Sequence, residues 1–321
     1  MDKRSHTLSR RRVLGAALAV PFAVTRCGGT STPAAATPAP TPGPPPEIGP
    51  NGWVLQTSSP QSPARNRHDD IFFLDRTHGW LVNPRAEVHG TQDGGASWQQ
   101  LAKLPSDQFL RCVGFSSLTT GWAGNLNVTV GQIKPDYSLF ETTDGGRTWA
   151  NISSRIQGAT VVGLCGMRLP APNTIVSVGR WNGPAVFVKS TDGGRSWISK
   201  SLAGLATGMV DVFFFDALQG FAVGGLGVGS SDAEQRSSRT VILATSDGGN
   251  TWQTRYTSAG VGQWAWKIHF VDPSGFVLNA IGRIPRSITT DHAGTSVLAS
   301  ITVIVFDGME PATTHFPSGV T

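Results

Sequence analysis

Short apolar runs followed by turn residues recur along this chain. Ile71–Leu74 is followed by the turn pair Gly79-Trp80. Val212–Phe215 leads in the same way to Gly220-Phe221. Runs of this length that end in turn residues predict β-strands, and no Ala/Leu/Glu/Lys-rich stretch predicts a long helix. In a third unit we expect Asn173 to take the place of the turn glycine, because asparagine tolerates left-handed backbone.

A second motif, Ser/Thr-x-Asp-Gly-Gly-x-Ser/Thr-Trp, repeats in register with these strand pairs. Four copies are complete, and a fifth keeps only its aspartate and hydroxyl residues. The aspartates and tryptophans of the motif are Asp93 and Trp98, Asp144 and Trp149, Asp192 and Trp197, Asp247 and Trp252, and finally Asp291. Successive aspartates lie 51, 48, 55 and 44 residues apart. A period of this length indicates the blades of a propeller or the units of a solenoid.

Each residue type in the motif has a structural explanation. Asp-Gly marks a tight hairpin, because glycine adopts positive φ without a steric penalty. The carboxylate is expected to accept hydrogen bonds from N–H groups of the turn and from the hydroxyls two residues before it and four after it. The tryptophan is expected to begin the next strand and to bury its ring. We therefore expect no catalytic role for these aspartates.

The two motifs together predict an all-β fold, a β-propeller of four-stranded antiparallel blades. The box hairpin joins the third strand to the fourth, and five blades, the last incomplete, are recognisable within residues 51–321. Residues 301–321 contain neither motif and stay unassigned. The segment 53–57 resembles the strand that follows a box, and we expect it to complete the last blade and close the ring.

Residues 1–26 have the pattern of an export signal. Arg10-Arg11-Arg12 precedes the apolar run Val13–Val24, which is shorter than the roughly 20 residues of a membrane-spanning helix. The adjacent arginines resemble a twin-arginine signal. Cys27 lies where a bacterial lipoprotein is lipidated, although Arg26 departs from that pattern. The proline-rich linker 27–50 would then hold an exported, periplasmic or cell-surface domain away from its membrane tether.

Composition and charge exclude several functions. The chain has 39 glycines, 10 tryptophans and only 15% charged residues, which is typical of short strands joined by glycine turns. Its net charge of +5 comes from residues 1–26, and the remaining residues carry 20 basic and 20 acidic groups. A neutral domain has no general attraction for nucleic acid. Adjacent residues of a strand point to opposite faces, so the His68-Asp69-Asp70 run is a poor metal site, and no metal or cofactor is expected.

Cysteine usage allows two alternatives. Cys112 and Cys165 fall at similar points in successive repeats. They are either buried free thiols or, in an oxidising compartment, partners in a disulfide.

The repeated motif resembles the Asp-box, or bacterial neuraminidase repeat. With the strand pairs before it, the chain is similar to the photosystem II assembly and stability factor family. The resemblance implies a non-enzymatic scaffold that holds partner proteins during assembly. Asp-boxes also occur in sialidases, xyloglucan-degrading glycosidases and sortilin-type receptors, so the motif specifies the fold more closely than the function.

The alternative function is glycoside hydrolysis, of a sialidase-like or xyloglucanase-like kind. A sialidase needs a tyrosine nucleophile, for which only Tyr137 and Tyr256 are available, and Arg283-Ile284-Pro285 lies at the wrong end of the chain for the sialidase motif it echoes. Other glycosidases need two carboxylates across a cleft. Asp69-Asp70 and Asp211 are acids outside the boxes with no structural role evident from sequence.

A binding partner, protein or glycan, is more plausibly recognised by the irregular segments between strands. Arginine and tryptophan are the usual anchors of interfaces. The candidates, expected to be exposed, are Arg180, Trp181, Arg236, Arg239, Trp264 and Trp266.

Overall fold

The computed structural model describes residues 58–60, 67–105, 108–127, 135–227, 231–270, 276–277, 303–307 and 310–314. All described residues belong to one unit, Pro46–Thr321. The predicted export signal, Cys27, the linker, the strand 53–57 and Asp291 lie outside the described residues.

Four sheets carry one Asp-box each. Their strands are β1 (Asp70–Phe73), β2 (Gly79–Val82), β3 (Glu87–Thr91) and β4 (Gln99–Lys103); β5 (Leu110–Phe115), β6 (Gly121–Asn125), β7 (Leu139–Thr142) and β8 (Ala150–Asn151); β10 (Gly166–Ala171), β11 (Thr174–Gly179), β12 (Val186–Ser190) and β13 (Trp197–Ser201); and β14 (Gly208–Phe214), β15 (Gly220–Leu226), β16 (Arg239–Thr245) and β17 (Gln253–Thr257). Within each set, successive strands pair antiparallel, which confirms the predicted blade.

Other elements complete the described part of the chain. The third sheet gains a fifth strand, β9 (Ile156–Gly158), which runs parallel to β13. A further three-stranded sheet contains β18 (Phe276–Val277), β19 (Val303–Asp307) and β20 (Glu310–Thr314). The described helices are short: η1 (Pro135–Tyr137), η2 (Ser153–Arg155) and α1 (Asp232–Ser237). The fold is therefore all-β, a propeller of four-stranded antiparallel blades, as predicted.

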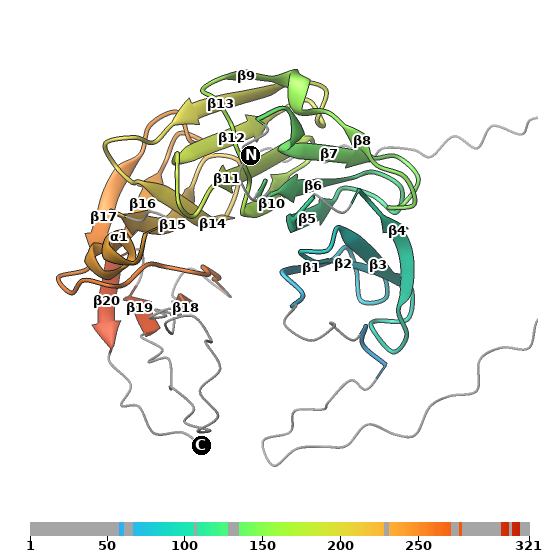
Figure 1. Ribbon diagram of the computed structural model, residues 1–321, viewed down its shortest axis with the longest axis horizontal. Helices are drawn as coiled ribbons and strands as arrows, with labels where there is room; N and C mark the ends of the chain where they lie inside the picture. The colour runs from blue at the N-terminus through green and yellow to red at the C-terminus, as the bar shows by residue number, and fades with distance from the viewer. Residues whose placement is uncertain are drawn as a thin grey trace, which may run out of the picture. The chain divides into compact units, whose positions relative to one another are not determined.

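The first strands of the four box-bearing sheets are the inner strands. In chain order, β1 contacts β5, β5 contacts β10, and β10 contacts β14 (Figure 1). The apolar core lies between consecutive sheets: one cluster joins Trp80 of the first sheet to Phe115 of the second, and another joins Phe187 of the third to Phe214 of the fourth. Packing sheet against sheet buries the apolar face of every blade.

The box fixes the register within each blade. The first box hydroxyl lies opposite the turn glycine in three sheets, as in the pair Thr91 and Gly79. In the third sheet the residue opposite Ser190 is Ile175. Asn173, at φ 59°, therefore does not take the glycine position but lies two residues earlier, in the turn itself. The prediction of left-handed backbone was right, and the predicted position was wrong.

The two hairpins of a blade are joined through the first glycine of the box. Its N–H donates to a carbonyl in the turn between the first and second strands of the same blade, at N–O distances of 2.8–2.9 Å. The accepting carbonyls are those of Thr77, Thr119, Asn173 and Leu218. A backbone bond of this kind ties the box loop to the other turn at the same end of the sheet.

Candidate functional site

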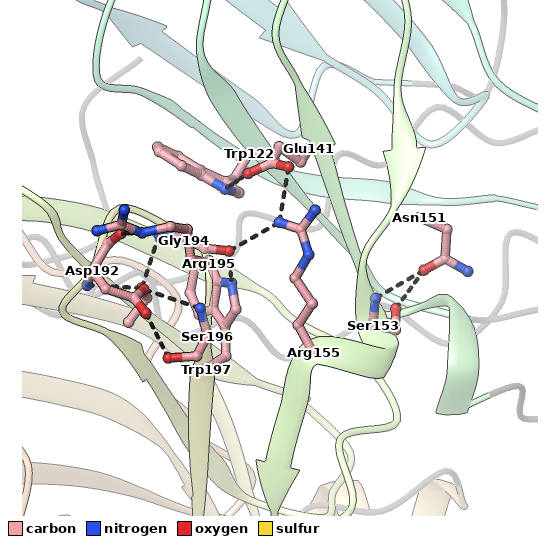
Figure 2. A network of polar contacts seen from close by, with 11 residues as sticks. Trp122, Glu141, Asn151, Ser153, Arg155, Asp192, Gly194, Arg195, Ser196 and Trp197 are labelled. Carbon is pink, nitrogen blue, oxygen red and sulfur yellow. Dashed lines mark hydrogen bonds and ion pairs between the residues drawn. The ribbon is translucent and has the colours of Figure 1, made fainter.

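The carboxylate of each described box is saturated by its own loop. In the first box, the hydroxyl of Thr91 and the N–H of Ser97 donate to Asp93 Oδ1 over 2.7 and 2.9 Å. The hydroxyl of Ser97 donates to Oδ2 over 2.5 Å. The same three bonds recur at Asp144, Asp192 (Figure 2) and Asp247.

These hydrogen bonds keep the box carboxylates ionised. The serine or threonine hydroxyl four residues on lowers the pKa of Asp93, Asp144 and Asp247 to about 2. The pKa of Asp192 is lowered for the same reason. A catalytic acid at neutral pH needs the opposite shift, so these groups are suited to holding a loop and unsuited to donating a proton.

A donor from one blade also reaches the box backbone of the next. Trp80 Nε1 donates to the carbonyl of Gly145 over 2.9 Å. Lys189 Nζ donates to the carbonyl of Gly248 over 3.0 Å. Between the second and third sheets Arg155 has this role: its Nη1 lies 3.1 Å from the carbonyl of Gly194 and 2.9 Å from Glu141 Oε2 (Figure 2).

A different set of polar residues gathers on the inner strands. One position recurs on the first strand of all four sheets. In the first sheet Thr91 pairs with Gly79, and the residue three positions after Gly79, Val82, pairs with Asp70 of the first strand. This position places Asp70, Cys112, Gly166 and Asp211 opposite Val82, Gly124, Val178 and Val223. Lys267 is the equivalent residue of the fifth unit, because the apolar run that follows it aligns with the run after Asp70.

Lys267 brings two of these acids together. Its Nζ lies 3.5 Å from Asp70 Oδ1 and 3.7 Å from Asp211 Oδ2. Arg168 Nη2 lies 3.9 Å from the same Asp211 oxygen. We call Asp69, Asp70, Arg111, Arg168, Asp211 and Lys267 the inner-strand charge cluster.

Both acids of this pair also join neighbouring segments. Asp70 Oδ2 accepts the backbone N–H of Val113 over 3.0 Å, and Asp211 Oδ2 accepts that of Ile268 over 3.2 Å. Burial raises the pKa of Asp70, and Lys267 opposes that rise. Asp211 is fully buried, and its Oδ1 has no hydrogen-bond partner among the described residues.

Two cations of the cluster, Lys267 and Arg168, reach solvent, while Arg111 and the acids are buried. The side chains of Lys267 and Arg168 are 40% and 30% exposed, whereas those of Asp70 and Asp211 are 9% and 0% exposed. A ligand that approaches the cluster therefore meets an ammonium and a guanidinium group first.

Aromatic residues adjoin the cluster through Arg111. Its guanidinium carbon lies 5.4 Å from the centre of the Trp266 ring, and its Nη1 donates to the carbonyl of Asp69 over 3.1 Å. The Trp264 ring centre is 6.3 Å from that of Trp266 and also 6.3 Å from that of Trp181. The three tryptophans thus form one group beside the buried guanidinium of Arg111.

Sequence comparison relates the first part of the chain to known proteins. Residues 55–162 match the family described as photosynthesis system II assembly factor YCF48. A segment of 86 residues is 30% identical to the photosystem II assembly lipoprotein Ycf48 of Synechococcus sp. (strain CC9902). The chain is an Asp-box β-propeller, and this first part of it is similar to Ycf48. The segment spans 26% of this chain and only 23% of that relative.

Solved structures that resemble the chain include two YCF48 proteins and a glycosidase. YCF48 bound to a D1 peptide is 18% identical, with a TM-score of 0.34, over 68% of this chain and 92% of that one. YCF48 from Cyanidioschyzon merolae is 15% identical, with a TM-score of 0.31, over 69% and 96%. The GH74 xyloglucanase from Xanthomonas campestris is 16% identical, with a TM-score of 0.48, over 77% and 38%.

The expected exposure of the candidate binding residues needs correction. Arg180 and Trp264 are only 7% and 3% exposed, and Trp181 and Trp266 are half-buried. The reason is that the two irregular segments fold onto each other and onto Val210. Arg236 on α1 and Arg239 at the start of β16 are exposed, as expected. The domain therefore presents parts of two tryptophan rings, and not a row of free aromatic side chains.

Residues that the sequence did not single out are Arg111, Arg168 and Lys267. Aligning the repeats on their apolar runs places Lys267 in the same column as Asp70 and Asp211, and this opposite charge was the available signal. Arg111 and Arg168 stand outside that column, so only the packing of the sheets reveals them.

The cysteines, possible metal ligands and possible membrane-spanning helices were also compared with the described structure. Cys112 and Cys165 are buried free thiols, and burial raises the pKa of both. Within the described ranges, no three His, Cys, Asp or Glu side chains are placed to hold a metal ion. No described helix is long and apolar enough to cross a membrane.

Proposed function

We propose that this Ycf48-like domain is an exported, non-enzymatic scaffold that binds a polypeptide segment of a partner protein during assembly. The similarity of residues 55–162 to an assembly-factor family supports this role. A solved relative holds a D1 peptide, which makes a protein segment the favoured kind of partner.

The main support for the proposal is that the box aspartates and the inner-strand charge cluster have different roles. The box aspartates are hydrogen-bonded within their own loops. The solvent-facing groups of the inner-strand charge cluster are cationic. Exposed cations bind a carboxylate through charge-assisted hydrogen bonds, and the half-buried rings of Trp181 and Trp266 offer apolar contact. The partner segment should therefore offer a carboxylate, from a side chain or a chain end, next to an apolar or aromatic residue.

Site-specific photo-crosslinking in the exporting cells tests this proposal. A benzoylphenylalanine at the exposed position His269, two residues from Lys267, should crosslink a polypeptide. The same probe at Ile198, which is 51% exposed on β13, should not. The Lys267→Glu substitution should abolish the product from position 269. An absent product, or equal products at the two positions, would contradict the proposal.

One observation favours the glycosidase alternative. Asp70 and Asp211 lie within 4 Å of the same Lys267 Nζ, so two acids outside the boxes do meet. The Lys267 ammonium, however, stands between the carboxyl groups where an inverting enzyme needs a water or a retaining enzyme needs the sugar. Purified protein assayed on sialosides and β-glucans should show no turnover. Turnover lost in Asp70→Asn at an unchanged melting temperature would establish the enzyme instead.

The exported location and lipid anchor are part of the proposal. The Synechococcus relative is named a lipoprotein, and Cys27 follows the predicted signal. Cys27→Ser should move the protein from the membrane fraction to the soluble extracytoplasmic fraction. An unchanged distribution would exclude lipidation of Cys27 as the tether.

A further inference from the structure

A hollow of about 520 Å³ lies between the box end of the first sheet and that of the second. The first sheet contributes its box loop and the start of β4, including Trp98 and Gln99. The second sheet contributes the turn residue Thr119 and the box residue Arg147. The hollow shares no lining residue with the inner-strand charge cluster.

The hollow lies where two successive blade interfaces differ in side chains. Glu141 lies opposite Trp122 in the second sheet, and the register-equivalent residue opposite Trp80 in the first sheet is Gly90. Glu141 accepts from Trp122 Nε1 over 3.2 Å and from Arg155 over 2.9 Å. Figure 2 shows these side chains occupying the space between the second and third sheets. Gly90 has no side chain, and Leu101 lies over it instead, since a Cβ on Gly90 would be 2.5 Å from Leu101 Cδ1. Gly90 and Leu101 both line the hollow.

The lining combines an aromatic ring with neutral polar groups. The Trp98 ring is half-buried and braced edge-on by Phe73, with ring centres 6.0 Å apart. Gln92 and Gln99 are exposed beside it and offer amide donors and acceptors. A braced aromatic ring surrounded by a few polar groups is the usual composition of a small-molecule site.

The charges of the lining oppose each other. Asp93 and Arg147 are both exposed at its edge, and the Asp93 carboxylate is already occupied by Thr91 and Ser97. Arg147 Nη1 donates to the carbonyl of Asp144 over 2.8 Å. Charges of both signs therefore meet at this edge, so the lining favours neither an anion nor a cation. The polar lining also disfavours a purely apolar molecule, because the amides would lose their hydrogen bonds to water.

We propose that this hollow binds a short neutral oligosaccharide. One sugar ring would lie with its C–H face against Trp98, and its hydroxyls would bond to Gln92, Gln99 and Thr119. A sugar suits the site because it presents an apolar face and an edge of neutral donors and acceptors at once. The site is independent of the proposed protein-binding role and would give the domain a second ligand.

Calorimetric titration of the purified domain with maltotriose, cellotriose and triacetylchitotriose tests this assignment. At least one of the three should bind saturably. Gln99→Ala, an exposed change, should weaken that binding severalfold, and Trp98→Ala should weaken it at least tenfold. The matched control is Thr143→Ala, since Thr143 holds in the second box the position that Gln92 holds in the first.

The outcomes are decisive even if Trp98→Ala fails to fold, because Gln99→Ala leaves the core untouched. No binding of any of the three sugars at 10 mM, a concentration on the order of the weakest useful affinities, would overturn the assignment. Binding that survives Gln99→Ala unchanged would overturn it as well. Loss of sugar binding would leave the crosslinking at position 269 unaffected, so the two proposals fail separately.

Discussion

At the scale of single residues, the aspartate and the tryptophan of each box have different structural roles. The aspartate is held at the surface by hydroxyls of its own loop, and the tryptophan packs beneath that loop. Trp197 is fully buried and donates from Nε1 to the carbonyl of Gly194 over 3.0 Å. Trp252 is 8% exposed, and Trp98 and Trp149 are half-buried. Burial thus differs between copies of one motif, although the hydrogen bonds of the aspartates do not.

Trp197→Ala should therefore destabilise the domain strongly. Removing a fully buried tryptophan costs about 3–5 kcal/mol of unfolding free energy through lost contacts and a cavity. Ile198→Ala is the control, because Ile198 follows Trp197 on β13 with its side chain 51% exposed. It should change the unfolding free energy by less than about 0.5 kcal/mol. Urea denaturation of the two variants measures both values, and equal effects would contradict the assigned burial.

The lowered pKa values of the box aspartates predict an acid limit to stability. A carboxyl group whose pKa falls from 3.8 unfolded to about 2 folded stabilises the fold above its unfolded pKa, and the stabilisation is lost as pH falls through the folded pKa. The melting temperature should be nearly constant above about pH 5 and should fall between about pH 4 and pH 2. Asp144→Asn should melt lower at pH 7 and lose less on acidification. A parallel decline of the two proteins would contradict the role of this carboxylate.

At the scale of elements, the second box glycine determines how closely two blades approach. Gly194 has φ 83°, and a Cβ placed on it would lie 2.5 Å from Trp122 Nε1 of the preceding sheet. The corresponding Cβ on Gly146 would lie 3.4 Å from Trp80. The double glycine is therefore required by the neighbouring blade as well as by the turn.

Gly194→Ala should cost more stability than Gly204→Ala. Both glycines have positive φ, but a Cβ on Gly204 would have nothing within 4 Å. Gly204→Ala should cost about 1 kcal/mol, from backbone strain alone. Gly194→Ala should cost a further 1–3 kcal/mol, roughly the penalty for overpacking a core. Thermal denaturation of the pair gives the difference, and its absence would show that the blades are not in tight contact here.

Features that depend on residues within one repeat could be predicted from the sequence, whereas features that depend on contacts between repeats could not. The strands, the box hairpins and the blade depend on residues within one repeat, so their pattern was sufficient. The inner-strand charge cluster depends on how separate repeats meet: Asp70 and Lys267 are 197 positions apart. The exposure of Trp264 was wrongly predicted for the same reason, since it packs against Val210 and against Trp181 from another repeat.

At the scale of the whole described domain, the ion pairs of Lys267 join the first inner strand to the last described repeat. Lys267 forms ion pairs with both Asp70 and Asp211, and those acids in turn accept the backbone N–H groups of Val113 and Ile268. One lysine therefore contributes both to cohesion between repeats and to the cationic surface proposed to bind the partner.

Lys267→Met should separate these two contributions. The methionine keeps most of the apolar stem but leaves two buried carboxylates without their shared cation, so the melting temperature should fall. Adding Asp70→Asn should recover part of the loss, because the remaining acid Asp211 still has Arg168 nearby. A double variant no more stable than Lys267→Met alone would show that the lysine does not stabilise the domain through Asp70.

The central claim is that the box residues build the blades while the inner-strand surface recognises a partner. The most direct measurement is the crosslinking yield from position 269, taken per folded molecule, in Asp144→Ala and in Lys267→Glu. Asp144→Ala should lower the melting temperature and leave the yield unchanged, and Lys267→Glu should remove the product from molecules that remain folded. A yield that falls with Asp144→Ala and survives Lys267→Glu would contradict the account.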